Sequence, residues 1–170
     1  GVEVIGIDSI EGGYDPRIKH WRLEQFDGSS DFEYHNLSIN DQNGLTALLR
    51  RRNVDAIVNL AALAGVRASI ENPHEYYRVN VLGTLTLLEI CKSFGIPTFV
   101  LASTSSIYGN AAQPFVEDGA LGAMLSPYAA SKKAAEDLSR TYHALFGFDV
   151  AILRYFTVYG PAGRPDMSIF

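Results

Sequence analysis

The sequence has little that would crosslink it, bind a metal or cross a membrane. Its 170 residues include one cysteine, Cys91, so an internal disulfide cannot form. The four histidines lack the paired spacing of a metal site, and we expect no metal. No apolar run reaches the roughly 18 residues of a membrane span, and residues 1–4 resemble neither a signal peptide nor a transit peptide. These absences predict a soluble protein of the reducing cytoplasm.

Long runs of positively charged residues are absent as well. The formal net charge is −5, and the longest basic run is Arg50-Arg51-Arg52. We expect no nucleic-acid partner, because binding a phosphate backbone requires concentrated positive charge. What the sequence does have is apolar content: hydrophobic residues make up 47% of the chain, enough for one core. A single domain covering residues 1–170 is therefore expected.

Strand-like and helix-like stretches alternate along the whole chain. The strand-like segments are residues 2–8, 32–37, 54–60, 97–102 and 148–155, and the helix-like segments are residues 17–26, 41–52, 72–94 and 128–145. This alternation predicts an α/β fold with a doubly wound parallel sheet and right-handed crossovers. Segment 54–60 is almost continuously apolar, which predicts a strand covered on both faces.

The helix expected after Ser126-Pro127 carries a tyrosine and a lysine four residues apart, Tyr128 and Lys132. This spacing places the phenol and the ammonium on one helical face. A fixed cation beside a phenol stabilises the phenolate, so Tyr128 is a candidate proton acceptor. The same spacing is common on ordinary surface helices, and the spacing alone leaves both interpretations open.

Two expected strands end in segments that could face a ligand. Ser103-Thr104-Ser105-Ser106 follows segment 97–102, at the strand end where open α/β sheets bind ligands. Small residues from Ala61 to Gly65 follow segment 54–60 and would let a flat cofactor approach the backbone, and Arg67 could face a diphosphate. A polar turn in the first case, and a loop with a solvated arginine in the second, explain the same residues without a ligand.

Two further polar residues stand out because of their positions. Asp8 ends the first expected strand, where an acid can accept hydrogen bonds from adenosine ribose hydroxyls, although it can also simply begin a turn. Asn80 lies in the middle of an otherwise apolar helical stretch. A buried amide needs partners, which could be a neighbouring loop carbonyl or a ligand.

Taken together, these segments resemble the extended short-chain dehydrogenases, the NAD-dependent epimerase/dehydratase family. The resemblance rests on the acid-ended strand, Asn59-Leu60-Ala61-Ala62, the Ser103–Ser106 turn, Tyr-x-x-x-Lys and the run from Leu153 to Pro161. It implies NAD as a retained cofactor and a Rossmann-like domain. It also implies an internal fragment that lacks the first strand, whose absence exposes two sheet edges, and that lacks the Gly-rich phosphate turn and the C-terminal substrate domain. Relatives commonly form homodimers through the helices corresponding to residues 72–94 and 128–145.

The resemblance also implies a role for each candidate residue. Tyr128 takes the proton of a sugar 4-hydroxyl, Thr104 bonds the same oxygen, and Lys132 supports Tyr128. The 4-keto sugar then turns over and takes the hydride back on its other face. The catalytic residues are thus Thr104, Tyr128 and Lys132; the cofactor-binding residues are Asp8, Leu60, Ala61, Ala62, Asn80, Ser103, Tyr128 and Lys132; and the substrate-binding residues are Arg67, Thr104, Ser105, Ser106, Tyr128, Thr157 and Arg164.

Local features narrow the implied reaction within this family. Ser105 and Ser106 stand where sugar-nucleotide dehydratases usually carry an Asp-Glu pair, and where decarboxylases usually carry a Glu, which leaves epimerisation. Residues 163–167 look like the corresponding segment of UDP-glucuronate 4-epimerases, and Thr157 with Arg164 would hold the C6 carboxylate of a UDP-uronic acid. A UDP-hexose 4-epimerase, a UDP-glucuronate decarboxylase and a non-catalytic truncated fragment remain as alternatives.

Overall fold

The computed structural model describes residues 1–10 and 14–163 of the chain. The chain divides into two compact units. One comprises residues 1–38 together with the chain from residue 157 onward, and the other comprises residues 39–156. Each unit is described by itself.

In its described residues, 1–10, 14–38 and 157–163, the smaller unit contains two parallel strands and one helix. Strand β1 (Val4–Ile7) pairs with β2 (Phe32–His35), with Val4 opposite Phe32. Helix α1 (Pro16–Glu24) begins at Asp15, whose carboxylate accepts a hydrogen bond from the backbone N–H of Arg17. A Cβ at Gly6 would lie 2.7 Å from the Phe32 ring, so a larger residue here would require that ring to shift.

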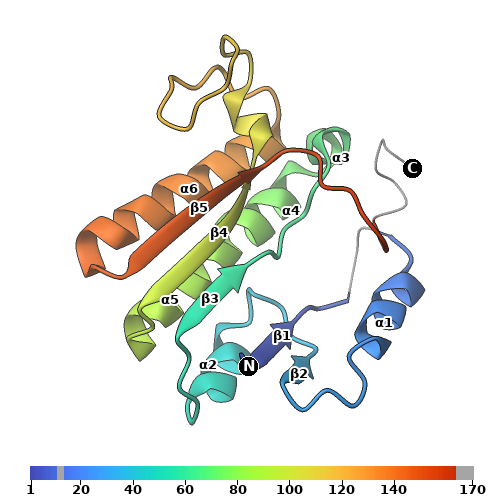
Figure 1. Ribbon diagram of the computed structural model, residues 1–170. Helices are drawn as coiled ribbons and strands as arrows, with labels where there is room; N and C mark the ends of the chain where they lie inside the picture. Colours follow the sequence, from blue (N-terminus) through green and yellow to red (C-terminus); the bar gives the residue numbers. More distant parts are fainter. Residues whose placement is uncertain (11–13, 164–170) are drawn as a thin grey trace. The chain divides into compact units, whose positions relative to one another are not determined.

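The larger unit contains a three-stranded parallel sheet and five helices (Figure 1). Its strands are β3 (Ala56–Asn59), β4 (Thr98–Thr104) and β5 (Asp149–Tyr155), in the order β3-β4-β5. Its helices are α2 (Gln42–Leu49), α3 (Val66–Glu71), α4 (Pro73–Tyr77), α5 (Thr84–Phe94) and α6 (Pro127–Phe146). The strands and helices alternate as the sequence predicts, and the α/β fold with parallel strands is confirmed.

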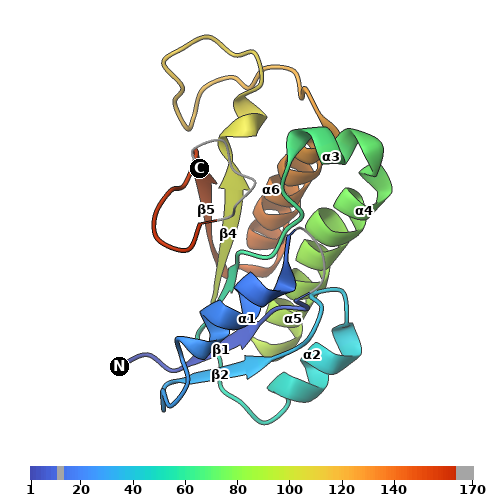
Figure 2. The ribbon, with the colours of Figure 1, turned by 90° about the vertical axis from the view of Figure 1, so that its right-hand side faces the viewer.

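Helices α5 and α6 cover one face of this sheet (Figure 2). The fully buried side chains that fill the interface include Leu88, Ile90, Cys91, Phe99 and Leu101. Burying each of the larger ones contributes about 1.5–3 kcal/mol, so this interface is the main source of the unit's stability. It also fixes the position of α6 against the carboxyl ends of β4 and β5.

The prediction that segment 54–60 is covered on both faces is wrong. Val58 is 57% exposed and Leu60 is 67% exposed. Residues of β5 alternate between exposed and half-buried along the strand, as expected when only one face of a sheet is covered. The reason is that α5 and α6 both pack on the opposite face of the sheet.

The helix predicted over residues 72–94 is interrupted in the structure. It begins as α4, continues as a π-helical segment (Arg78–Gly83), and becomes α-helical again in α5, which ends at Gly95 in the left-handed conformation (φ 66°). The short helix α3 was not expected from the sequence. Among the described residues, no helix is long and apolar enough to cross a membrane.

Candidate active site

Helix α6 presents the Tyr128–Lys132 pair at its first turns. Ser126 caps the helix by accepting a hydrogen bond from the Ala129 N–H at 3.1 Å, and Pro127 occupies the first helical position. Tyr128 and Lys132 follow on one face, four residues apart. Tyr128 is half-buried and Lys132 is only 3% exposed. The spacing therefore belongs to a buried helical face and not to an ordinary surface helix.

The side chain of Lys132 is buried as a whole. Burial lowers the pKa of Lys132 from 10.5 to about 8, and the negative charge of Glu136 on the next turn opposes this effect. Within residues 1–10 and 14–163 the ammonium makes no hydrogen bond or ion pair. A buried amine with a strongly lowered pKa is typical of functional sites, because the protein accepts the cost of desolvating it.

The hydroxyl-rich turn follows directly from β4, against which α6 packs. Thr104 is buried, and its Oγ1 accepts a hydrogen bond from the Ser106 N–H at 3.1 Å, which starts the 3₁₀ turn Ser105–Tyr108. Ser103 is also buried, and its hydroxyl donates to Glu136 Oε1 at 2.5 Å. The segment thus forms a polar turn. The hydrogen bond from Ser103 to Glu136 joins the start of this turn to α6, the helix that carries Tyr128 and Lys132.

Tyr76 of α4 supports the ring of Tyr128. The two rings meet edge to face, with centroids 6.3 Å apart and planes at 82°. The Tyr76 hydroxyl donates to the backbone oxygen of Ala64 at 2.9 Å. Tyr76 thus connects the Tyr128 ring to the segment that follows β3, where Gly65 has a φ of 113°.

Asn80 binds the same segment from the π-helical turn. Its Oδ1 accepts from the Leu63 N–H at 2.8 Å, and its amide donates to the Leu63 oxygen at 3.1 Å and to Ser131 Oγ at 3.0 Å. Of the two partners that the sequence left open, the loop carbonyl is present. Asn80 therefore fixes the loop after β3 against the residue that precedes Lys132.

The remaining candidates of the larger unit lie around this segment. Leu60, at the end of β3, and Ala62 are exposed, and Ala61 is half-buried. Arg67 lies in the short helix α3 and is exposed. Residues 60–62 thus lie at or near the surface at the carboxyl end of β3.

The sequence patterns did not predict the buried ion pair between Glu136 and Arg154. Glu136 is fully buried, and Arg154 of β5 donates to it through Nε at 3.1 Å and through Nη2 at 2.9 Å. Ion pairing with Glu136 raises the pKa of Arg154 further above its usual value. One signal was available in the sequence: Glu136 stands four residues after Lys132, on the face already singled out.

Three candidates fall within the smaller unit, and the structure describes two of them. Asp8 follows β1 and is exposed, and its Oδ1 accepts from the Ile10 N–H at 2.6 Å and from Lys19 Nζ at 3.2 Å. Thr157 is exposed and lies outside any helix or strand. Arg164 lies outside the described residues, although the preceding segment is held by Arg22, which donates to the Gly163 oxygen at 3.2 Å.

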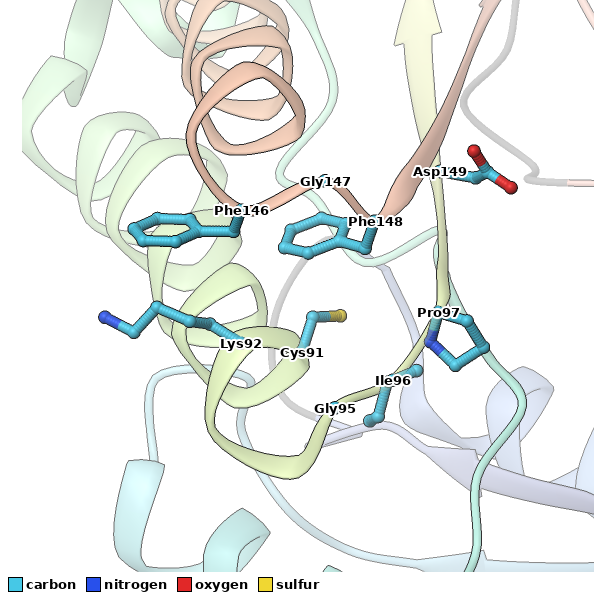
Figure 3. Close-up of a pocket in the computed structure, with 9 residues that line it drawn as sticks. All are labelled: Cys91, Lys92, Gly95, Ile96, Pro97, Phe146, Gly147, Phe148 and Asp149. Atoms are coloured by element: carbon cyan, nitrogen blue, oxygen red, sulfur yellow. The ribbon is translucent and has the colours of Figure 1, made fainter.

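A depression of about 440 Å³ lies elsewhere in the larger unit (Figure 3). It lies where α5 and α6 end and where β4 and β5 begin, with Phe146 and Phe148 beside Cys91 and Lys92. The hydroxyl-rich turn is at the opposite end of β4, so this depression is not part of the candidate site. Burial raises the pKa of the Cys91 thiol to about 12, so this cysteine is unreactive as a nucleophile.

No cluster of metal-ligating side chains occurs in the described part of the chain.

Comparisons with known proteins give a consistent result. The chain is 51% identical, over all of its 170 residues, to UDP-glucuronate 4-epimerase of Thermodesulfobacterium geofontis. The structure of UDP-glucuronic acid 4-epimerase from Bacillus cereus, in complex with UDP-glucuronic acid and NAD, matches 98% of the chain at 36% identity with a TM-score of 0.88. A dTDP-glucose 4,6-dehydratase from Streptomyces venezuelae, with NAD and DAU bound, also has a TM-score of 0.88, at 34% identity over 98% of the chain.

The likeness covers the whole chain but only part of each relative. The chain spans about half of their lengths, 53% of the Thermodesulfobacterium protein, 52% of the Bacillus structure and 50% of the Streptomyces structure. The sequence profile of the NAD dependent epimerase/dehydratase family matches residues 1–170. The chain belongs to the NAD dependent epimerase/dehydratase family.

Proposed function

We propose that the whole protein is a nucleotide-sugar 4-epimerase that interconverts UDP-glucuronate and UDP-galacturonate. The whole protein means the protein at its full encoded length. The observation that carries this proposal is the buried Lys132 one helical turn from Tyr128, on a helix packed against the hydroxyl-rich end of β4. The relative at 51% identity, a UDP-glucuronate 4-epimerase, supports the choice of reaction.

The chain's residues fit NAD as the cofactor. The ammonium of the buried residue Lys132, which has no partner among the described residues, suits the hydroxyls of a nicotinamide ribose. Asp8 directly follows β1 and is exposed, and its carboxylate suits an adenosine ribose and disfavours a 2′-phosphate. Leu60, Ala61 and Ala62 leave the backbone accessible for a flat group. When bound, NAD supplies the reversible hydride acceptor that a 4-epimerisation needs.

The proton transfer is assigned to the chain's own side chains. Tyr128 takes the proton of the sugar 4-hydroxyl and returns it when the epimer forms. Thr104 uses an Oγ1 lone pair for the Ser106 N–H, so its own hydroxyl hydrogen remains free to bond the same sugar oxygen. Lys132, when protonated, stabilises the phenolate form of Tyr128. Asn80 is assigned to the cofactor site, where its bonds to Leu63 hold the segment after β3.

Epimerisation is favoured over dehydration by the composition of the turn. Elimination of water from the 4-keto sugar requires an additional acid and base beside the sugar. Ser105 and Ser106 are neutral at every accessible pH, and the buried carboxylate of Glu136 is occupied by Arg154 and Ser103. The fold similarity to a dehydratase equals that to an epimerase and does not distinguish the two reactions, so the proposal of epimerisation rests on these side chains.

The substrate specificity is assigned to Thr157 and Arg164, with Arg67, Ser105 and Ser106 as further substrate contacts. A guanidinium binds a planar carboxylate through two parallel hydrogen bonds, and a threonine hydroxyl can add a third. The wild-type whole protein is thus expected to prefer UDP-glucuronate over UDP-glucose. A homodimer formed through α5 and α6, and a cytoplasmic location, are further parts of this proposal.

The experiment compares two substrates in the whole protein carrying Arg164→Leu. kcat/KM for UDP-glucuronate should fall by at least about 100-fold, because a charge-assisted bidentate contact is lost, while kcat/KM for UDP-glucose should change by less than about threefold. Arg51→Leu, at the end of α2 and outside the site, is the matched control. Equal losses for both substrates would refute the specificity assignment, and a wild type inactive on both would refute the epimerase itself.

A further inference from the structure

The carboxylate of Glu136 joins three structural elements. It accepts hydrogen bonds from Ser103 at the end of β4 and from Arg154 of β5, and Arg140 of α6 approaches its Oε2 at 3.4 Å. Arg154 extends the network further, because its Nη1 donates to the backbone oxygen of Glu117 at 2.9 Å and its guanidinium lies over the Tyr108 ring at 5.2 Å. One buried carboxylate thus connects the helix, both strand ends and the loop after the turn.

We propose that Glu136 is a positioning residue of the epimerisation site, which holds the Ser103–Thr104 end of β4 against helix α6 and provides the counter-charge for Lys132. The inference rests on the proposed function for its catalytic consequence. Its geometric part rests on the hydrogen bonds of Glu136 alone.

A contribution to the stability of the fold does not by itself explain why the buried pair of Glu136 and Arg154 is present. Replacing a buried ion pair by well-packed apolar residues is often neutral or stabilising, because desolvation of both charges offsets their attraction. Glu136 lies one helical turn from Lys132, and Arg154 lies beside the hydroxyl-rich turn through its contact with Tyr108. The pair is therefore placed where it acts on the groups that carry the chemistry.

The electrostatic part follows from the charges around Lys132. The ionisable groups on α6 and on the elements packed against it include Tyr128, Glu136 and Arg140 of α6, Arg154 of β5, Tyr108 of the 3₁₀ turn and Tyr76 of α4. Among them Glu136 raises the pKa of Lys132, against the lowering caused by burial. Removing its charge would leave the buried Arg154 cation uncompensated beside α6, so protonated Lys132 would become still less favourable.

The test is the pH dependence of kcat for UDP-glucuronate in the whole protein. Glu136→Gln should move the alkaline limb to lower pH by about one unit, with a loss of about tenfold in kcat at pH 8.5 and a KM changed by less than about threefold. The double variant Glu136→Gln/Arg154→Met should move the limb part of the way back, because the uncompensated cation is gone. Arg140→Met, which removes the exposed neighbour of the same carboxylate, is the matched control and should leave the limb in place.

Two additional measurements keep the proposal testable if Glu136→Gln folds poorly or if the wild type lacks epimerase activity. Glu136→Asp keeps the charge but shortens the reach to Ser103, so it should lower kcat while the alkaline limb of the kcat profile stays at its wild-type pH.

NMR titration of the Lys132 ¹³Cε signal measures the charge effect without catalysis, and the Lys132 pKa should be lower in Glu136→Gln than in the wild type. An unchanged limb and an unchanged Lys132 titration in a folded Glu136→Gln protein would overturn the inference, whereas an inactive wild type would overturn the proposed function only.

Discussion

Replacing Lys132 by methionine should make the protein more stable while removing its activity. The pKa of Lys132 is lowered from 10.5 to about 8, so the folded protein disfavours the ammonium that the unfolded chain carries freely. At about 1.4 kcal/mol for each pKa unit, this difference costs the folded state about 3 kcal/mol at pH 7. Methionine has nearly the same length and no charge, so Lys132→Met should recover most of that free energy of unfolding.

The pH dependence of this gain follows from the two pKa values. Below pH 8 the lysine is charged in both states, and the full cost is present. As the pH rises from 8 toward 10.5, the folded state loses its proton first and the cost declines, to about 1 kcal/mol at pH 10. Lys132→Met should therefore stabilise the protein strongly at pH 7 and weakly at pH 10.

The assay is urea unfolding of the whole protein, freed of bound nucleotide, at pH 7 and pH 10. The matched control is Lys133→Met, because Lys133 forms an exposed ion pair with Asp137 on the same helix and should change stability by less than about 1 kcal/mol at either pH. A Lys132→Met variant that is destabilised at pH 7, or equally stabilised at both pH values, would refute the assignment of Lys132 as a desolvated cation.

Two further predictions concern the supports of the site. Asn80→Ala should lower the free energy of unfolding by about 2–4 kcal/mol, because it leaves the Leu63 N–H and C=O without their partners, and it should raise the KM for NAD; a stability within 0.5 kcal/mol of wild type in urea unfolding would contradict this. Ser126→Ala removes the cap of α6 and should cost about 1 kcal/mol, measured in the same way, and Ser126→Asp should restore most of it. Were Ser126→Ala and Ser126→Asp equally stable, the cap would have no energetic role.

The positions of most helices and strands could be predicted from the sequence, because their signals are local. Ser126-Pro127 marks the start of α6, and Gly147 ends it in the left-handed conformation (φ 77°). The parallel pairing of the strands likewise agrees with the alternation of strand-like and helix-like segments. Local capping and periodicity were sufficient for these features.

Other features depend on contacts between distant residues and could not be predicted. The π-helical segment around Asn80 is accompanied by bonds to Leu63 and Ser131, which lie 17 and 51 residues away in the sequence. The Glu136–Arg154 pair forms because β5 lies beside α6, which no local pattern encodes. The exposed side chain of Val58 reflects which face of the sheet the helices cover, and strand hydrophobicity alone does not reveal that.

The central claim is that Tyr128 carries the proton in a 4-epimerisation, and one measurement tests it most directly. The rate of conversion of UDP-glucuronate to UDP-galacturonate is compared between the wild-type whole protein and Tyr128→Phe, with Tyr142→Phe of the same helix as control, since Tyr142 bonds Glu89 outside the site. We predict that Tyr128→Phe loses at least about 100-fold in kcat with an unchanged fold, while Tyr142→Phe retains activity. A folded Tyr128→Phe enzyme with a rate near that of the wild type would contradict the claim.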